Sequence, residues 1–93
     1  MSLTVLLPRA LYPYARGSAT LRLDERCLTV GDALSVVKAR WPGVADRVMT
    51  ERGDVREHVN IFVGEENVRF AEGLATRVDD GDTIMIVAAV SGG

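Results

Sequence analysis

Residues 29–41 read TVGDALSVVKARW, and this stretch decides the fold. Its apolar residues recur every three or four positions, which places them on one face of a helix. They are Val30, Ala33, Leu34, Val37 and Trp41. The spacing predicts a helix over Val30–Arg40, and the apolar stripe of this helix must be covered by a sheet.

Both ends of this helix are marked in the sequence. Thr29 precedes the apolar series and Asp32 follows three residues later, which is the spacing of a short capping box. The Asp32 carboxylate is also favoured near the positive end of the helix dipole. Pro42-Gly43 is expected to stop the helix.

Strands are predicted on both sides of the helix. β-Branched residues, alternating apolar positions and bounding turn residues indicate strands, and these signals occur at residues 3–7, 19–23, 59–63, 68–70 and 83–88. The first two strands are expected to form a hairpin. The last, TIMIVA, is an almost unbroken apolar run, which predicts a strand that is covered on both faces or central in the sheet.

The connections complete an α+β domain. A short helical turn is predicted over Val44–Met49, and the polar stretch Thr50–His58 is predicted to be an exposed loop. Turns are expected at residues 64–67 and 79–82. The order of elements therefore predicts one sheet with one principal helix packed across it, while periodicity leaves the strand order open.

Composition narrows the class of protein. The 93 residues suffice for one small domain, and 47% hydrophobic with 26% charged residues is the balance of a globular chain. The net charge is -2 and the eleven Lys and Arg residues are scattered, which argues against a nucleic-acid partner. Without a signal peptide or an apolar run of membrane-spanning length, the expected compartment is the cytoplasm and no membrane partner is expected.

The cysteine, the histidine and the clustered carboxylates of this chain do not form a pattern that predicts a catalytic or metal site. Cys27 is the only cysteine, so it is interpreted as a small buried hydrophobe between the second strand and the helix. His58 lacks a second ligand and is interpreted as a surface residue. Glu65-Glu66 and the carboxylates at 79–82 are interpreted as turn residues, with Gly81 supplying a positive φ.

Three sequence features coincide in the second half of the chain. They are NIFV at 60–63 followed by a turn, Asp80-Gly81-Asp82 before an apolar strand, and AVSGG at 89–93. Together they resemble the ThiS and MoaD family of ubiquitin-like sulfur carriers over essentially the whole chain. The resemblance implies a β-grasp fold, with a mixed sheet of four to five strands and one main helix. It divides the chain into a β-grasp domain, residues 1–88, and a flexible C-terminal tail, residues 89–93.

One branch of this family resembles the chain more closely. Asn67-Val68-Arg69-Phe70 and Gly73-Leu74-Ala75-Thr76 are similar to the pattern of the actinobacterial carrier used in cysteine biosynthesis, and Thr50–His58 resembles an extra loop of that branch. Many family members have a proline just before the final stretch, where this chain has Ala88. This departure affects the expected path of the tail and leaves the terminal glycines unchanged.

The resemblance implies a function for the last residue. The Gly93 carboxylate would be adenylated by an E1-like enzyme of the ThiF/MoeB type and converted to a thiocarboxylate, with Ala89, Val90, Ser91 and Gly92 as the flexible tail. The carrier would bind no cofactor, because the partner enzyme uses the ATP. The thiocarboxylate would donate sulfur to a second enzyme, and in the cysteine branch these partners would be a pyridoxal-phosphate-dependent cysteine synthase and a metalloprotease.

A partner-binding surface is expected around Arg69, Phe70 and Leu74, which flank the last strand and its tail together with Val90. Phe70 and Leu74 could equally complete the core, and Arg69 could add a charged contact at the rim. Two rival functions also stay open. The chain could be a ubiquitin-like modifier that is conjugated to lysines through Gly93, or a non-covalent interaction domain.

Overall fold

The computed structural model describes residues 1–88, so the predicted tail, residues 89–93, lies outside the described residues. Within residues 1–88, five strands form one mixed sheet in the order β2-β1-β5-β3-β4. The strands are β1 (Leu3–Leu6), β2 (Thr20–Leu23), β3 (Val59–Val63), β4 (Glu66–Asn67) and β5 (Thr83–Ala88). The helices are α1 (Val30–Arg40) and α2 (Pro42–Val48), with 3₁₀ helices η1 (Arg9–Ala15), η2 (Val68–Phe70) and η3 (Gly73–Ala75).

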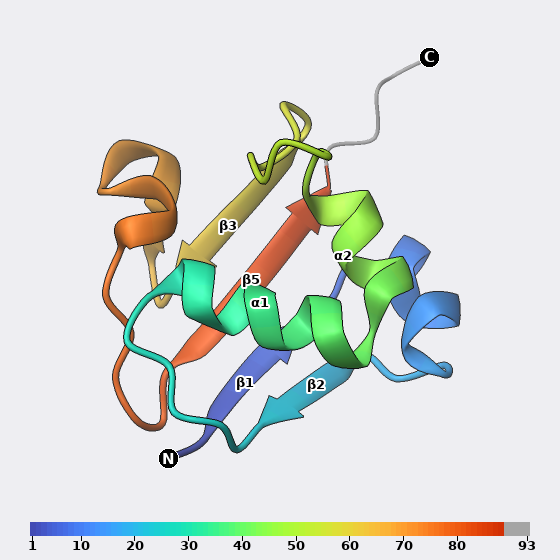
Figure 1. The fold of residues 1–93 in the computed structure, drawn as a ribbon, viewed down its shortest axis with the longest axis horizontal. Helices are drawn as coiled ribbons and strands as arrows, with labels where there is room; N and C mark the ends of the chain where they lie inside the picture. The colour runs from blue at the N-terminus through green and yellow to red at the C-terminus, as the bar shows by residue number, and fades with distance from the viewer. Residues whose placement is uncertain (89–93) are drawn as a thin grey trace.

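The sheet is organised around its last strand. β5 runs parallel to β1 and antiparallel to β3, so the first and last strands of the described chain lie side by side in the sheet (Figure 1). β1 and β2 form the predicted antiparallel hairpin, in which Val5 pairs with Leu21. The central position that the apolar run of β5 predicts is therefore confirmed. The predicted β-grasp arrangement, a mixed sheet with a main helix across it, is also confirmed.

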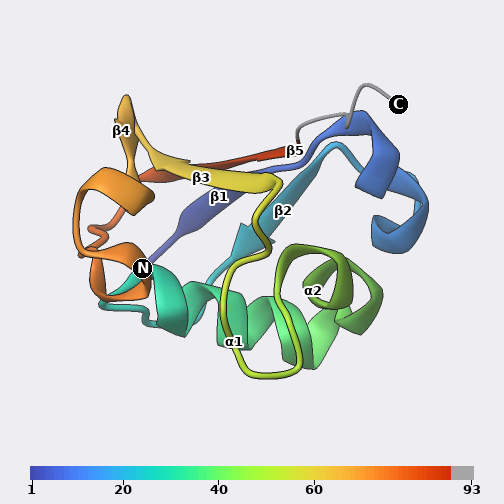
Figure 2. The same cartoon turned by 90° about the horizontal axis from the view of Figure 1, so that it is seen from above.

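One face of the sheet is covered by helices. Figure 2 shows the strands in one layer and α1 with α2 together on one side of it. α1 buries the predicted stripe of Val30, Ala33, Leu34 and Val37. These side chains pack in one core with inward-facing residues of the sheet such as Ile84. The helix thus occupies the position that its amphipathic spacing requires.

The predicted capping box of α1 is confirmed. The Thr29 hydroxyl accepts a hydrogen bond from the Asp32 amide at 3.1 Å, and the Asp32 carboxylate accepts from the Thr29 amide at 3.3 Å. A second bond from the Leu28 amide to the same carboxylate, at 2.9 Å, extends the cap. Such a cap contributes about 1 kcal/mol to stability. It fixes the start of α1 at the residue that the sequence predicts.

Two helical segments differ from the prediction. Pro42 ends α1, as expected, and also occupies the first turn of α2, where its missing amide proton has no helical partner to lose. The second helix therefore begins at Pro42, two residues before the predicted start of the turn. The sequence analysis predicted no helix between the first two strands, where η1 forms because Leu11 and Ala15 both reach the core.

The predicted fourth strand at residues 68–70 is wrong. The strand is β4, Glu66–Asn67, and residues 68–70 form η2. The Asn67 side chain accepts a hydrogen bond from the Arg69 amide at 2.9 Å, so it caps a helical turn where the strand would have continued. This turn buries Val68 in the core. The sequence analysis mistook this buried valine for a residue of a strand.

The opposite face of the sheet is open. The residues of β5 alternate between buried and exposed, with Ile84 and Ile86 in the core and Met85 and Val87 on the other face. The prediction that β5 is covered on both faces is therefore wrong, while the alternative of a central strand holds. An antiparallel or mixed sheet with one solvated face explains this alternation.

Candidate functional site

The last described residue, Ala88, ends the central strand. It pairs with Val59 at the start of β3, and β1 lies on the other side of β5. The chain therefore leaves the sheet in the middle of one end, between two neighbouring strands (Figure 1). We call Ala88 the tail root, because the predicted tail follows it directly.

An apolar surface lies beside the tail root on the open face of the sheet. Leu6, Met85 and Val87 project from adjacent strands, and a hollow of about 420 Å³ lies over them with Pro8 and Tyr12 at its rim. Met85 and Val87 are each 37% exposed. Exposed apolar surface of this kind is typical of a protein-docking surface.

The sequence analysis did not single out these residues. The sequence of β5 contained a signal for this surface, because side chains alternate between the two faces of a strand. Residues 85 and 87 therefore face away from the buried residues 84 and 86. This signal was hidden because all of these residues are apolar, so the strand lacks the polar alternation that marks a solvated face. Only the position of α1 on one face of the sheet shows which of the two sets of alternating side chains is exposed.

The three predicted partner-binding residues lie together on the other side of β3, and they differ in exposure. Phe70 is 84% exposed, so it does not complete the core. Leu74 is partly buried against the core, so for this residue the core interpretation is supported. Arg69 and Leu74 line a groove of about 420 Å³ along β3, next to Val59. The structure thus supports an exposed surface at Phe70 and leaves partner binding a prediction.

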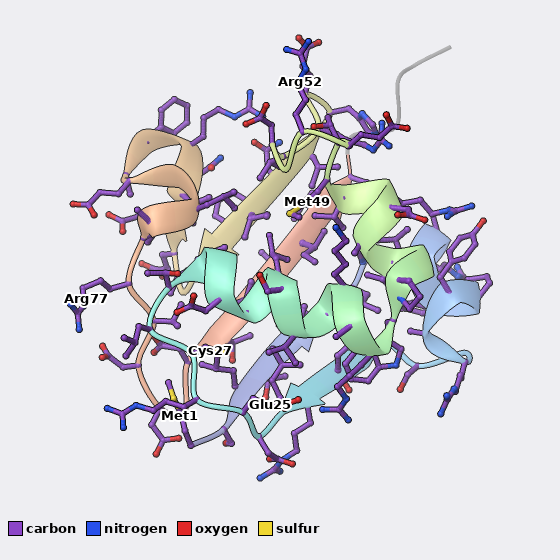
Figure 3. All side chains as sticks on the ribbon, in the orientation of Figure 1. Met1, Glu25, Cys27, Met49, Arg52 and Arg77 are labelled. Atoms are coloured by element: carbon purple, nitrogen blue, oxygen red, sulfur yellow. The ribbon has the colours of Figure 1, made fainter. Side chains whose placement is uncertain are left out.

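Cys27 is fully buried, which confirms its interpretation as a small hydrophobe. Its amide donates to the Met1 sulfur at 3.4 Å, and Figure 3 shows both residues at the end of the sheet away from the tail root. Burial, and then the nearby carboxylates of Asp32 and Glu25, raise the pKa of the Cys27 thiol above its ordinary value. A buried, protonated thiol at the far end of the sheet is a poor nucleophile for sulfur transfer.

This raised pKa predicts a pH dependence of stability. The unfolded thiol ionises near its ordinary value of 9.0, while the native thiol keeps its proton to higher pH. The contribution of Cys27 is thus fully present below pH 9.0 and is lost as the pH rises from there through the native pKa. We expect wild type to lose up to about 1.4 kcal/mol per pH unit more than Cys27→Ala above this point. Urea unfolding of both proteins at several alkaline pH values measures the difference, and equal slopes would contradict it.

The remaining polar candidates have structural roles. Asp82 accepts a hydrogen bond from the Asp79 amide at 2.8 Å, and Asp80 accepts from the Ser2 amide at 2.7 Å. Gly81 has a φ of 87°, so the turn interpretation is confirmed. Among residues 1–88 no group of three or more His, Cys, Asp or Glu side chains is arranged to hold a metal ion. No helix in the same range has the length and hydropathy needed to cross a membrane.

Comparison with known protein families assigns the chain to a family. A model described as the ThiS family matches residues 5–93. The chain belongs to the ThiS family. This ThiS-family chain is 37% identical over 95 residues to the sulfur carrier protein CysO of Mycobacterium tuberculosis, and the alignment covers all of both proteins.

Solved structures agree with this assignment. The BexX/CysO complex of Amycolatopsis orientalis matches with a TM-score of 0.85 and 33% identity, over 98% of this chain and 99% of that chain. SAMP1 from Haloferax volcanii matches with a TM-score of 0.84 and 31% identity over all of both chains. SAMP1 is a small archaeal modifier protein. The chain is therefore a ubiquitin-like sulfur carrier, and the predicted family resemblance, including its CysO-type branch, is confirmed.

Proposed function

We propose that this chain carries sulfur as a thiocarboxylate on Gly93, which forms after a partner enzyme has adenylated the Gly93 carboxylate. The observation that supports this most is the position of the tail root. Ala88 ends the central strand beside an apolar surface of Leu6, Met85 and Val87, so a partner that covers this surface lies next to the start of the tail. The domain in residues 1–88 then provides the surface that each partner binds.

The chemistry requires activation, because a carboxylate is a poor electrophile. In the proposed first step the Gly93 carboxylate displaces pyrophosphate from ATP on an E1-like enzyme of the ThiF/MoeB type, which gives an acyl-adenylate. Sulfide then displaces AMP and leaves the thiocarboxylate. A persulfide that displaces AMP gives an acyl disulfide, which a thiol reduces to the same thiocarboxylate with formation of a new disulfide. The carrier binds no cofactor and supplies no catalytic group, since the partner enzyme holds the ATP.

The composition of residues 89–93 suits this role. Glycine has no Cβ, so Gly92 and Gly93 allow a partner's active site to approach the backbone closely. Five residues extend at most ~3.3–3.6 Å each, on the order of 17 Å in total. Ala89, Val90 and Ser91 therefore give Gly93 enough reach to pass through a channel in the partner enzyme while the domain stays outside.

A second partner accepts the sulfur. The thiocarboxylate is ionised and strongly nucleophilic at neutral pH, so it can attack an electrophile bound by another enzyme. The likeness to CysO, one structure of which is a complex with BexX, favours an acceptor that docks on the same carrier domain. For the cysteine branch we propose a pyridoxal-phosphate-dependent cysteine synthase as acceptor and a metalloprotease that regenerates the carrier, all in the cytoplasm, where ATP is available.

The direct test is the intact mass of the protein purified from its own host. Replacement of one carboxylate oxygen by sulfur adds about 16 Da, and the same spectrum establishes whether Gly93 is the last residue. Adducts on co-purified proteins identify the acceptor. A protein that is loaded neither in its host nor by its adenylating enzyme with ATP and sulfide would exclude the proposal.

A second candidate function rests on the archaeal relatives. Small archaeal modifier protein 3 of Haloferax volcanii is 40% identical over 72 residues, which cover 77% of this chain. A modifier would use the same activated Gly93 to form isopeptide bonds with lysines. Conjugates that survive on a denaturing gel, and that disappear when Gly93 is deleted, would favour this function. Full activity without Gly92 and Gly93 would instead favour a non-covalent interaction domain.

A further inference from the structure

Three arginine side chains each donate hydrogen bonds to main-chain carbonyl oxygens. Arg56 donates to the Asp46 carbonyl oxygen from Nε at 3.0 Å and from Nη2 at 2.8 Å. Arg69 donates from Nη2 to the carbonyl oxygens of Glu57 and Val59, at 3.1 and 3.2 Å. Main-chain carbonyls therefore fix both guanidinium groups in place.

The third arginine is held in a similar way. Arg47 donates from Nη1 to the Gly43 carbonyl oxygen at 3.1 Å. Its guanidinium also lies over the Tyr14 ring, 3.5 Å from the ring centroid. A carbonyl group and an aromatic face orient a guanidinium without cancelling its formal charge. We call Arg47, Arg56 and Arg69 the arginine collar.

Two members of the arginine collar lie beside the tail root, and the third lies one strand away. Arg47 and Arg56 line one hollow of about 460 Å³ together with Ala88 and His58. Arg69 approaches from the other side, because its acceptor Val59 is the strand partner of Ala88. The three cations thus come from α2, the loop before β3 and η2, and lie at the end of the sheet where β5 ends and β3 begins.

The collar is not neutralised by ion pairs within the part of the chain that the structure describes. The salt bridges there join Arg22 to Asp24 and Arg40 to Glu25, at other places on the surface. Asp46 lines the same hollow as Arg47 and Arg56, and Glu57 precedes His58, yet neither carboxylate forms a salt bridge with the collar. Asp54 lines the same groove as Arg69 and forms no salt bridge with the collar either, so three fixed positive charges stay without an ion pair among the described residues of a chain whose net charge is -2.

We propose that the arginine collar docks on an acidic rim around the channel through which the adenylating enzyme admits the tail. This inference rests on the proposed function. The tail spans up to about 17 Å, so the collar meets the protein surface at the channel mouth and not the ATP beyond it. Fixed charges at the edge of a docking surface speed association and set orientation, and they act beside the apolar surface on the open face of the sheet.

The test measures adenylation of Gly93 by pyrophosphate exchange, with the adenylating enzyme of the same organism. At about 0.1 M salt we expect Arg47→Gln and Arg69→Gln each to raise KM by about 3- to 10-fold with kcat unchanged, and the double variant to raise it further. Near 1 M salt the differences should nearly vanish, because the screening length falls from about 10 Å to about 3 Å. Circular dichroism and thermal unfolding establish that each variant is folded.

Two controls separate charge from structure. Arg77→Gln removes an exposed arginine on the far side of the molecule from the tail root (Figure 3), and its KM should stay at the wild-type value. Arg47→Lys and Arg69→Lys keep the charge and should restore most of the wild-type KM. An unchanged KM in the Gln variants, or a KM in the Lys variants that stays as high as in the Gln variants, would overturn the inference. Either result would leave the proposed function standing. A wild-type chain that is not adenylated at all would overturn the proposed function, and the inference with it.

Discussion

Deletion of Gly92 and Gly93 is expected to abolish sulfur loading, with a loss of at least about 100-fold, because the reacting carboxylate no longer reaches the activated phosphate of ATP. Extension of the tail by one residue is expected to block loading equally, since the carboxylate is then displaced from the reacting position by one residue. Intact mass measures both outcomes after incubation with the adenylating enzyme, ATP and sulfide, as the presence or absence of a gain of about 16 Da.

The matched control for these tail variants is Ser91→Ala, which keeps the length and both glycines and should load normally. Folding should be unaffected in all of them, because none of them changes a residue of the core that the structure describes within residues 1–88. A normal yield of thiocarboxylate from the extended chain would contradict the proposed role of Gly93. It would mean that the partner enzyme does not select the chain by the position of its last carboxylate.

Val87→Asp is expected to raise the KM for adenylation by about 30-fold, which corresponds to the loss of one central contact of about 2 kcal/mol. Val87 is 37% exposed on the open face of β5, next to the tail root, so the substitution places a carboxylate in the proposed docking surface without entering the core. Titration of the carrier against the adenylating enzyme measures KM and kcat separately.

Thr83→Asp is the control for this prediction, because Thr83 has the same parity as Val87 in the same strand and lies at the opposite end of β5. It puts the same charge on the same face, away from the tail root, and should change KM by less than about 3-fold. Val87→Thr keeps the branched shape and should lie between the two. Equal effects of the two Asp variants would refute a docking surface centred beside the tail root.

Much of the fold could be predicted from local signals. The helix Val30–Arg40 has an apolar stripe, a cap at both ends and a length typical of globular proteins, so several signals agreed on one element. β5 was equally clear, because six consecutive residues between turns are mostly apolar. The errors fall on short segments, such as residues 68–70, where a hydrogen bond from the Arg69 amide to the Asn67 side chain selects a 3₁₀ helix that propensity alone would not favour.

The candidate site was predicted only in part. Arg69, Phe70 and Leu74 were identified because they flank the last strand and its tail. The structure finds Arg69 and Phe70 exposed beside β3 and Leu74 partly buried. The apolar surface of Leu6, Met85 and Val87 and the cations Arg47 and Arg56 were missed. These residues come from separate elements, so their proximity depends on how the strands are ordered and not on any sequence spacing.

The sequence by itself determined that this protein has one amphipathic helix on one sheet, an apolar last strand and a Gly-Gly end, because these properties follow from the order and spacing of neighbouring residues. The tertiary structure alone decided that β1 pairs in parallel with β5, that α1 covers only one face, and that Arg47 and Arg56 line one hollow with the tail root. The physical reason is that pairing and coverage depend on side chains that are far apart in the chain. Their packing is selected by the burial of the whole core and not by any local pattern.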